Sequence, residues 1–150
     1  MKIPEIYSEW CEIFEKIETW EIGHQDVEIV EAMDKGNIRW ASGVAERITK
    51  RVLNLLNIRL EKLNTFFSKR LILTQNYFEM EQLLILYKKE LIFIKHIGDL
   101  EMLPKELRKI LTTEIINVAQ KTQLSLEDSA RKDLTGMLKR IVISNRIDNI

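Results

Sequence analysis

Cysteine, proline, glycine and histidine are all scarce in this chain of 150 residues. Cys11 is the only cysteine, so no disulfide framework forms within one chain, and a reducing compartment is expected. Two prolines and five glycines are too few for a turn-rich β-sandwich or barrel and favour long regular elements. The two histidines, His24 and His96, have no partner at metal-ligand spacing, so no metal site is predicted.

Long apolar runs are absent too. The longest are 83–86 and 91–94, far below the ~20 residues that a membrane helix needs. Glu5 and Glu9 stand where a signal peptide would have its apolar core. We therefore expect a cytoplasmic protein with no membrane segment.

The sequence also lacks the motifs that carry common catalytic chemistry. It has no zinc-protease motif, EF-hand loop, Gly-rich phosphate loop or di-iron Glu-x-x-His pattern. An enzyme with a thiol nucleophile would need Cys11 to lie beside His24 or His96 in the fold. This is the least favoured hypothesis. We expect a protein that is not an enzyme and that binds no cofactor.

The residues that are present suit one helical domain. Hydrophobic residues make up 45% and charged residues 31%, which is enough apolar material for a core under a highly charged surface. The charge is unevenly placed along the chain. Residues 1–36 hold ten acidic and three basic side chains, whereas residues 39–70 hold two acidic and eight basic ones. Neighbouring helices that complement each other explain this best, and the alternative is that each segment faces a different partner.

Apolar residues recur at the three-to-four spacing of helices almost throughout, which predicts an all-α fold. The dominant segment, 38–70, would be on the order of 45–50 Å long, so we expect an elongated bundle with one long central helix. Thr74 and Ser125 are predicted helix caps, and β-branched residues 141–143 suit a short C-terminal strand. Another predicted helix begins near Pro4. Four more are predicted to span about 26–36, 75–97, 104–120 and 126–143.

Arg59 is unusual because it lies within the apolar stripe of the long segment, beside Leu56, Leu60 and Leu63. In one reading its stem covers the core while its head reaches solvent. In the other it forms a bidentate pair with a carboxylate at a helix or subunit junction.

Residues 46–67 resemble the signature helix of GINS subunits, which belong to an accessory complex of the replicative helicase. The run from Arg59 to Phe67 is similar to the family pattern R-L-x-K-[IL]-x-x-F-F of the Sld-Five branch, which merges with the Psf-One type in archaea. Glu46 and Arg47 lie where the family has E-R, and the segments 74–87 and 103–107 resemble the next helix and the proline-containing start that follows it. The resemblance covers roughly residues 5–110.

The resemblance implies a non-catalytic scaffold in a tetramer, a dimer of dimers with a second GINS-type subunit. That assembly would bridge and activate the MCM helicase with a RecJ-like, Cdc-forty-five-type factor, in a cytoplasmic, nucleoid-associated setting. DNA contact would be indirect or weak. The predicted partner interface and subunit core draw on these residues: Arg59, Leu63, Phe66, Phe67, Tyr77, Phe78 and Tyr87.

The chain departs from the family pattern after its helical part. Family members of this branch usually append a β-rich B domain of about fifty residues. Here a helical A-like domain, 1–110, is followed by 111–150, which are predicted to be mostly helical. The alternative function is a helical, dimeric nucleic-acid-binding or phage and defence regulator, which would bind DNA in a salt-dependent way.

Overall fold

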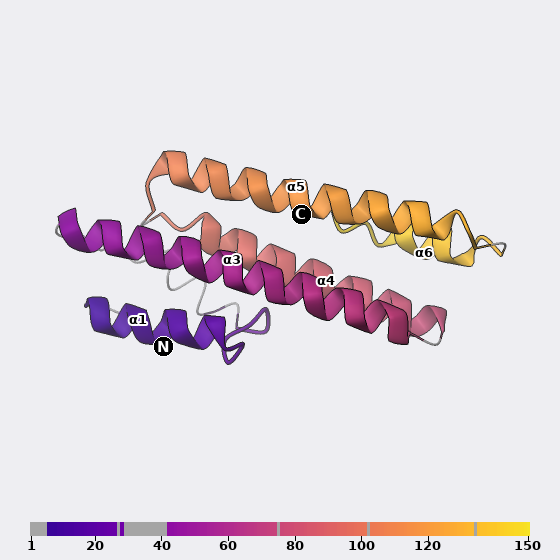
Figure 1. Ribbon diagram of the computed structural model, residues 1–150, viewed down its shortest axis with the longest axis horizontal. Coiled ribbons are helices and arrows are strands. Elements are labelled where there is room, and N and C mark those ends of the chain that lie inside the picture. The colour runs from indigo at the N-terminus through magenta and orange to yellow at the C-terminus, as the bar shows by residue number, and fades with distance from the viewer. Residues whose placement is uncertain (1–5, 27, 29–41, 75, 102, 134) are drawn as a thin grey trace.

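The computed structural model describes residues 6–26, 28, 42–74, 76–101, 103–133 and 135–150, and in these ranges it is all-α with no strand. The five helices lie nearly along one axis (Figure 1). Their bounds are α1 Tyr7–Glu18, α3 Ser42–Leu73, α4 Tyr77–Gly98, α5 Lys105–Ala130 and α6 Met137–Ser144. The all-α class is confirmed for the described residues. The helix expected over 26–36 lies almost entirely outside them.

The long helix α3 and its antiparallel neighbour α4 form the middle of the molecule. With 32 residues, α3 is about 48 Å long at 1.5 Å per residue. The α1 helix packs against α3 on one side, while α5 packs against α4 on the other, and α6 rests on both α4 and α5 (Figure 1). The hairpin of α3 and α4 is therefore a layer between α1 and α5.

The turn between α3 and α4 is capped differently from the prediction. The hydroxyl of Thr74 donates back to the carbonyl of Leu71 at 2.7 Å, so it closes the end of α3. The cap of α4 is Asn76, whose side-chain oxygen accepts from the backbone N–H of Glu79 at 2.8 Å. Thr74 and Asn76 lie two residues apart, and both residue types are common helix caps, so spacing alone does not separate them.

The C-terminal third contains the largest errors of the predicted helix bounds. No helix ends near residue 120: α5 continues to Ala130, because Ala119, Gln123, Leu126 and Ala130 extend its buried stripe at helical spacing. The expected cap at Ser125 is thus inside a helix. The helix is also continuous across residue 110, the end of the first predicted domain.

Residues 141–143 were predicted either to end a helix or to form a short strand, and the strand is wrong, because they lie in α6. A left-handed turn at Gly136, with φ of 71°, precedes this helix. Its side chain Val142 is buried, so packing against α5 outweighs the strand preference of β-branched residues.

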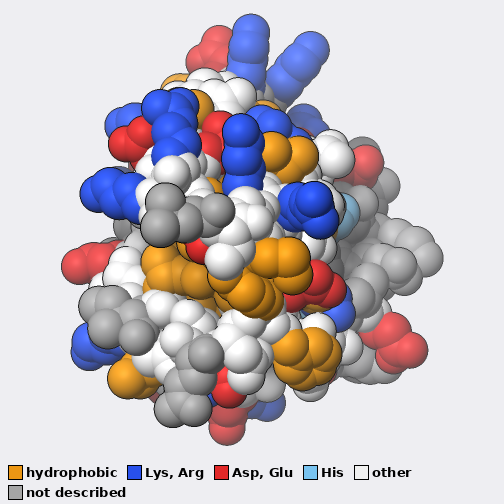
Figure 2. Space-filling view, turned by 90° about the vertical axis from the view of Figure 1, so that its right-hand side faces the viewer, with side chains coloured by type: hydrophobic (Ala, Val, Ile, Leu, Met, Phe, Trp, Pro, Cys, Tyr) orange, Lys and Arg blue, Asp and Glu red, His pale blue; other side chains and the backbone are white. Residues whose placement is uncertain are grey.

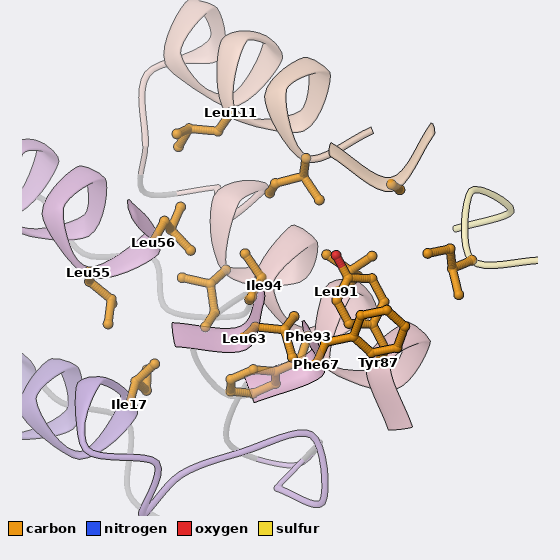
Figure 3. Close-up of a cluster of buried hydrophobic side chains, with 14 of the residues drawn as sticks. Ile17, Leu55, Leu56, Leu63, Phe67, Tyr87, Leu91, Phe93, Ile94 and Leu111 are labelled. Atoms are coloured by element: carbon orange, nitrogen blue, oxygen red, sulfur yellow. The ribbon is translucent and has the colours of Figure 1, made fainter. Parts of the chain in front are cut away.

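The core is one continuous cluster that draws on all five helices. Figure 3 shows side chains of α1, α3, α4 and α5 pointing toward one another, with Phe67 beside Tyr87. Those two rings are tilted, with centroids 4.3 Å apart. Gly98, at the end of α4, lets α5 approach closely, since a Cβ there would lie 3.3 Å from the Cβ of Leu111.

Candidate partner-binding surface

The seven residues of the predicted interface divide into two groups in the structure. Four are buried within this chain, and three are exposed. The buried group is Arg59, Leu63, Phe67 and Tyr87, and the exposed group is Phe66, Tyr77 and Phe78. Only the exposed group presents its side chains to a partner.

Arg59 is fully buried, with an exposed fraction of 0%, so the reading in which its head reaches solvent is wrong. Its Nη1 donates to the carbonyls of Ile17 and Ile22 at 2.6 and 2.7 Å, and its Nη2 donates to Glu90 Oε2 at 2.7 Å. The arginine does pair with a carboxylate at a helix junction, but through one nitrogen rather than two. Arg59 thereby joins the end of α1 to α3 and α4.

Glu90 completes this network from the inner face of α4. Its second oxygen, Oε1, lies 2.5 Å from Nδ1 of His24 and also accepts from the His24 backbone N–H at 3.4 Å. Both carboxylate oxygens are therefore used, which the burial of a charged group requires. Glu90 was not among the predicted residues. The signal for it was the same as for Arg59, a charged residue in the apolar stripe formed by Tyr87, Leu91 and Ile94.

Two aromatic rings flank the buried guanidinium. Its central carbon lies 4.3 Å from the ring centroid of Trp20 and 4.8 Å from that of Phe93. Trp20 has a positive φ of 66°, a left-handed conformation that costs a bulky residue about 1–2 kcal/mol. The contact with Arg59 offsets part of that cost and holds the residues after α1 against the hairpin.

A smaller buried network ties α3, α4 and α5 together at Tyr87. Its hydroxyl donates to Asn64 Oδ1 at 2.7 Å and lies 3.2 Å from the hydroxyl of Thr122. Burial raises the pKa of Tyr87, and the hydrogen bond with Thr122 opposes that shift. Tyr87 thus acts in the core of this chain.

The acidic helix α1 packs on the basic helix α3, as the charge pattern favoured. Glu18 accepts from the guanidinium of Arg51, and the ammonium of Lys62 reaches the Glu18 carbonyl at 3.4 Å. The other glutamates of α1, at 9, 12 and 15, are exposed. This face of α1 therefore remains acidic.

Two of the three exposed residues, Phe66 and Phe78, line a hollow between the last turns of α3 and the first turns of α4, whereas Tyr77 contacts Asp133 and Thr135 instead. This hollow, here called the hairpin hollow, has a volume of about 560 Å³. Apolar side chains form most of its wall, with Arg70, Glu79 and Gln82 at its rim. The apolar wall consists of Phe66, Leu73, Phe78, Leu83 and Leu86. A second hollow of about 510 Å³ shares Phe66 and Leu86 and extends toward Trp20 and His24.

Two of the three most exposed large hydrophobic side chains among the described residues line the hairpin hollow. Phe78 is 73% exposed and Leu73 is 63% exposed. Among the large hydrophobic side chains that are described, only Leu124, at 65%, lies between them. Figure 2 shows this end of the molecule, with apolar side chains gathered near its middle, Lys and Arg side chains mainly above them, and Asp and Glu side chains at the sides. Exposed apolar residues that cluster are typical of interaction sites, whereas scattered ones are ordinary.

The described residues place little catalytic chemistry together. No group of three or more His, Cys, Asp or Glu side chains is arranged to hold a metal ion in that part of the chain. Cys11 is partly exposed, and its thiol raises the pKa of Tyr7. His24 is paired with Glu90, and His96 is exposed in the last turn of α4. No helix among the described residues combines the length and hydropathy that crossing a bilayer requires.

The comparisons with known proteins add no family to this picture, since no family model, no curated protein and no solved structure matches the chain.

Proposed function

We propose that this chain is a non-catalytic assembly subunit that binds partner proteins through the exposed end of its α3–α4 hairpin. The observation that carries the proposal is the apolar hollow at that end, whose wall residues Leu73 and Phe78 are mostly exposed. Burying one such side chain fully yields about 1.5–3 kcal/mol, so two or three of them can anchor a stable interface.

The specific form of the proposal is a GINS-like subunit of a replicative helicase assembly. It rests on the resemblance of residues 46–67 and of the segments that follow them. In this form the chain pairs with a second GINS-type subunit in a dimer of dimers, and the assembly bridges MCM and a RecJ-like, Cdc-forty-five-type factor. The motif's Arg59, Leu63 and Phe67 then hold the subunit together, and Phe66 meets the partner.

Co-expression tests this proposal. The chain is expressed alone and with the second GINS-type subunit of the same genome, and the mass in solution is measured by light scattering. We expect a hetero-oligomer near the mass of two plus two chains only on co-expression. A monomer or homodimer that ignores the second subunit would contradict the GINS-like form.

A nucleic-acid-binding regulator is the second candidate. The observation in its favour is a set of exposed cations in the last turns of α3, just after α5 and in α6, among them Lys69, Lys132 and Lys139. Such a regulator would bind DNA as an isolated chain, with an affinity that falls steeply as the salt concentration rises. The steepness of that fall reflects the number of phosphates contacted. An affinity that is weak and independent of DNA length and salt would exclude it.

A further inference from the structure

The end of the molecule that carries the hairpin hollow is basic as well as apolar. We define the hairpin end as the described residues of 69–79 and 128–140, which meet where Tyr77 contacts Asp133 and Thr135. We propose that the hairpin end binds an acidic amphipathic helix of a partner protein, whose apolar residues enter the hairpin hollow. This inference rests on the proposed function, because it names the class of partner that the assembly uses.

The charges of the hairpin end are unbalanced. It holds six basic and three acidic side chains. Asp128 pairs with Arg131 at 3.3 Å, and Asp133 accepts from the backbone N–H of Leu138 at 2.9 Å and from the hydroxyl of Thr135. Five cations have no carboxylate partner within the described part of the chain, namely Lys69, Arg70, Lys132, Lys139 and Arg140.

The hollow has the form that receives side chains. Its apolar wall comes from two antiparallel helices, and Arg70 stacks on Phe66 at its rim, with 5.8 Å from the guanidinium carbon to the ring centroid. A helix laid in such a groove inserts residues at positions i, i+3 or i+4, and i+7. On α3 the hollow extends from Phe66 to Leu73, roughly 10 Å at 1.5 Å per residue, so about two turns of a partner helix span it.

A protein helix fits these features better than a lipid surface or a nucleic acid does. A bilayer presents a flat surface and leaves a concave hollow of about 560 Å³ unfilled. Phosphates along a nucleic acid would meet Glu79 on the rim as well as the cations. A helix can place glutamates opposite Lys69 and Arg70 and leave neutral residues opposite Glu79, which is how interfaces achieve charge complementarity.

The experiment uses two synthetic helical peptides of fifteen residues, each labelled with fluorescein. Both carry leucines at positions 1, 4, 8 and 11, and they differ only in that the flanking positions are Glu in one and Lys in the other. Binding to the whole chain is measured by fluorescence anisotropy at physiological salt, where only close charge pairs persist. We expect the Glu peptide to bind at least about tenfold more tightly than the Lys peptide.

Two variants locate the binding. The double variant Lys69→Glu, Arg70→Glu should invert the preference, so that the Lys peptide binds more tightly. Phe78→Ser should weaken both peptides, because it removes a wall of the hollow. The matched control is Lys105→Glu, Lys109→Glu, exposed cations at the start of α5, which lies at the other end of the molecule (Figure 1). It should leave both affinities within about twofold, since charges beyond a Debye length are screened.

The outcomes separate this inference from the proposed function. Equal affinities for the two peptides, or no effect of Phe78→Ser, would overturn the acidic helix as occupant. So would binding of anionic vesicles or of a single-stranded oligonucleotide at the hairpin end when neither peptide binds. If the hetero-oligomer forms on co-expression yet no peptide binds, the assembly stands and the occupant is wrong. If the Glu peptide binds in a manner that depends on Phe78 but no hetero-oligomer forms, the surface stands and the GINS-like form is wrong.

Discussion

The two ends of the α3–α4 hairpin differ in how far their apolar residues are covered. At the end where α3 begins, α1 lies along the hairpin and buries Trp10, Phe14 and Ile17 against it. At the end where α3 finishes, none of the described helices covers Phe78 and Leu73, and they remain exposed. Both ends carry the same kind of amphipathic pattern. The comparison shows that the pattern sets which face of a helix is apolar, while a neighbouring element decides whether that face is core or interface.

The arginines of α3 repeat this contrast. Arg59 is buried in a network of two carbonyls and Glu90, whereas Arg70, three turns further on, is exposed and stacks on Phe66. The same residue type therefore holds the fold at one place and faces solvent at the other. Substitutions at matched positions can test whether the two ends have separate roles.

The largest effect is expected from Arg59→Met. This change keeps most of the apolar stem but leaves Glu90 buried without its cation and two carbonyls without their donor. Breaking a buried pair in this way costs about 3–5 kcal/mol of unfolding free energy. Urea denaturation measures it, with Arg70→Met as the control, which should change stability by less than about 0.5 kcal/mol. Equal losses in the two variants would remove the distinction.

A neighbouring pair of phenylalanines gives the next test. Phe67→Ala should lower the unfolding free energy by about 3–5 kcal/mol, because the ring is buried against Tyr87. Phe66→Ala should cost less than about 1 kcal/mol, since its ring is 39% exposed. The effect on partner binding should be the reverse. Phe66→Ala should weaken partner binding although it leaves the stability of the chain almost unchanged. Thermal unfolding measures the stability of each variant, and light scattering measures its assembly with the partner. Equal losses of stability in the two variants would mean that both residues belong to the core.

A smaller effect is expected where the C-terminal residues join the bundle. Gln123 is buried, donates to the carbonyl of Val142 at 3.3 Å and accepts from the backbone N–H of Ile147 at 3.1 Å. Gln123→Ala should cost about 1–3 kcal/mol, because it leaves these buried groups unsatisfied. Amide hydrogen exchange should become faster over residues 142–150, while the exposed control Gln120→Ala should leave it unchanged. Unchanged exchange in both variants would mean that Gln123 does not hold this segment.

The smallest effect concerns Asp133 at the hairpin end. The hydrogen bond from the Leu138 backbone N–H, helped by Thr135 and Tyr77, lowers the pKa of Asp133 below its usual value of 3.8. Its ionised form therefore stabilises the fold at pH values above the unfolded pKa of about 3.9, and this contribution is lost as the pH falls through the folded pKa.

The urea midpoints of the wild type and Asp133→Asn should accordingly differ by a constant amount above about pH 5 and converge at lower pH. Asp128→Asn is the control, because Asp128 makes only an exposed ion pair with Arg131. A gap between wild type and Asp133→Asn that is independent of pH would show that the hydrogen bonds do not depend on the charge of Asp133.

The parts of this fold that could be predicted from the sequence are those set by periodicity. Residues 42–73 and 77–98 were expected as helices within a few residues, because their apolar stripes are long and regular. The C-terminal end of α5 was predicted too early. Ser125 resembles a helix cap, whereas Leu126 and Ala130 continue the buried stripe of α5. Tertiary packing decided that case, as it did for the β-branched residues of α6.

The candidate surface was predictable only in part, for a related reason. Spacing places Phe66 and Phe67 on one helix but does not say which of them a neighbouring helix will bury. Arg59 was singled out because a charge in an apolar stripe is unusual, and Glu90 fits the same criterion on α4. The pairing between them joins positions 31 residues apart, which depends on how the two helices align and not on the pattern of either one.

The most direct test of two ends with separate roles is hydroxyl-radical footprinting, which reads the exposure of individual side chains. In the isolated chain, Phe66 and Phe78 should be oxidised rapidly and Phe14 and Phe67 slowly, in keeping with their burial. In the complex obtained by co-expression, Phe66 and Phe78 should become slow while the other two do not change. If Phe66 and Phe78 are oxidised at the same rate in the complex as in the isolated chain, the hairpin end is not the surface that binds the partner.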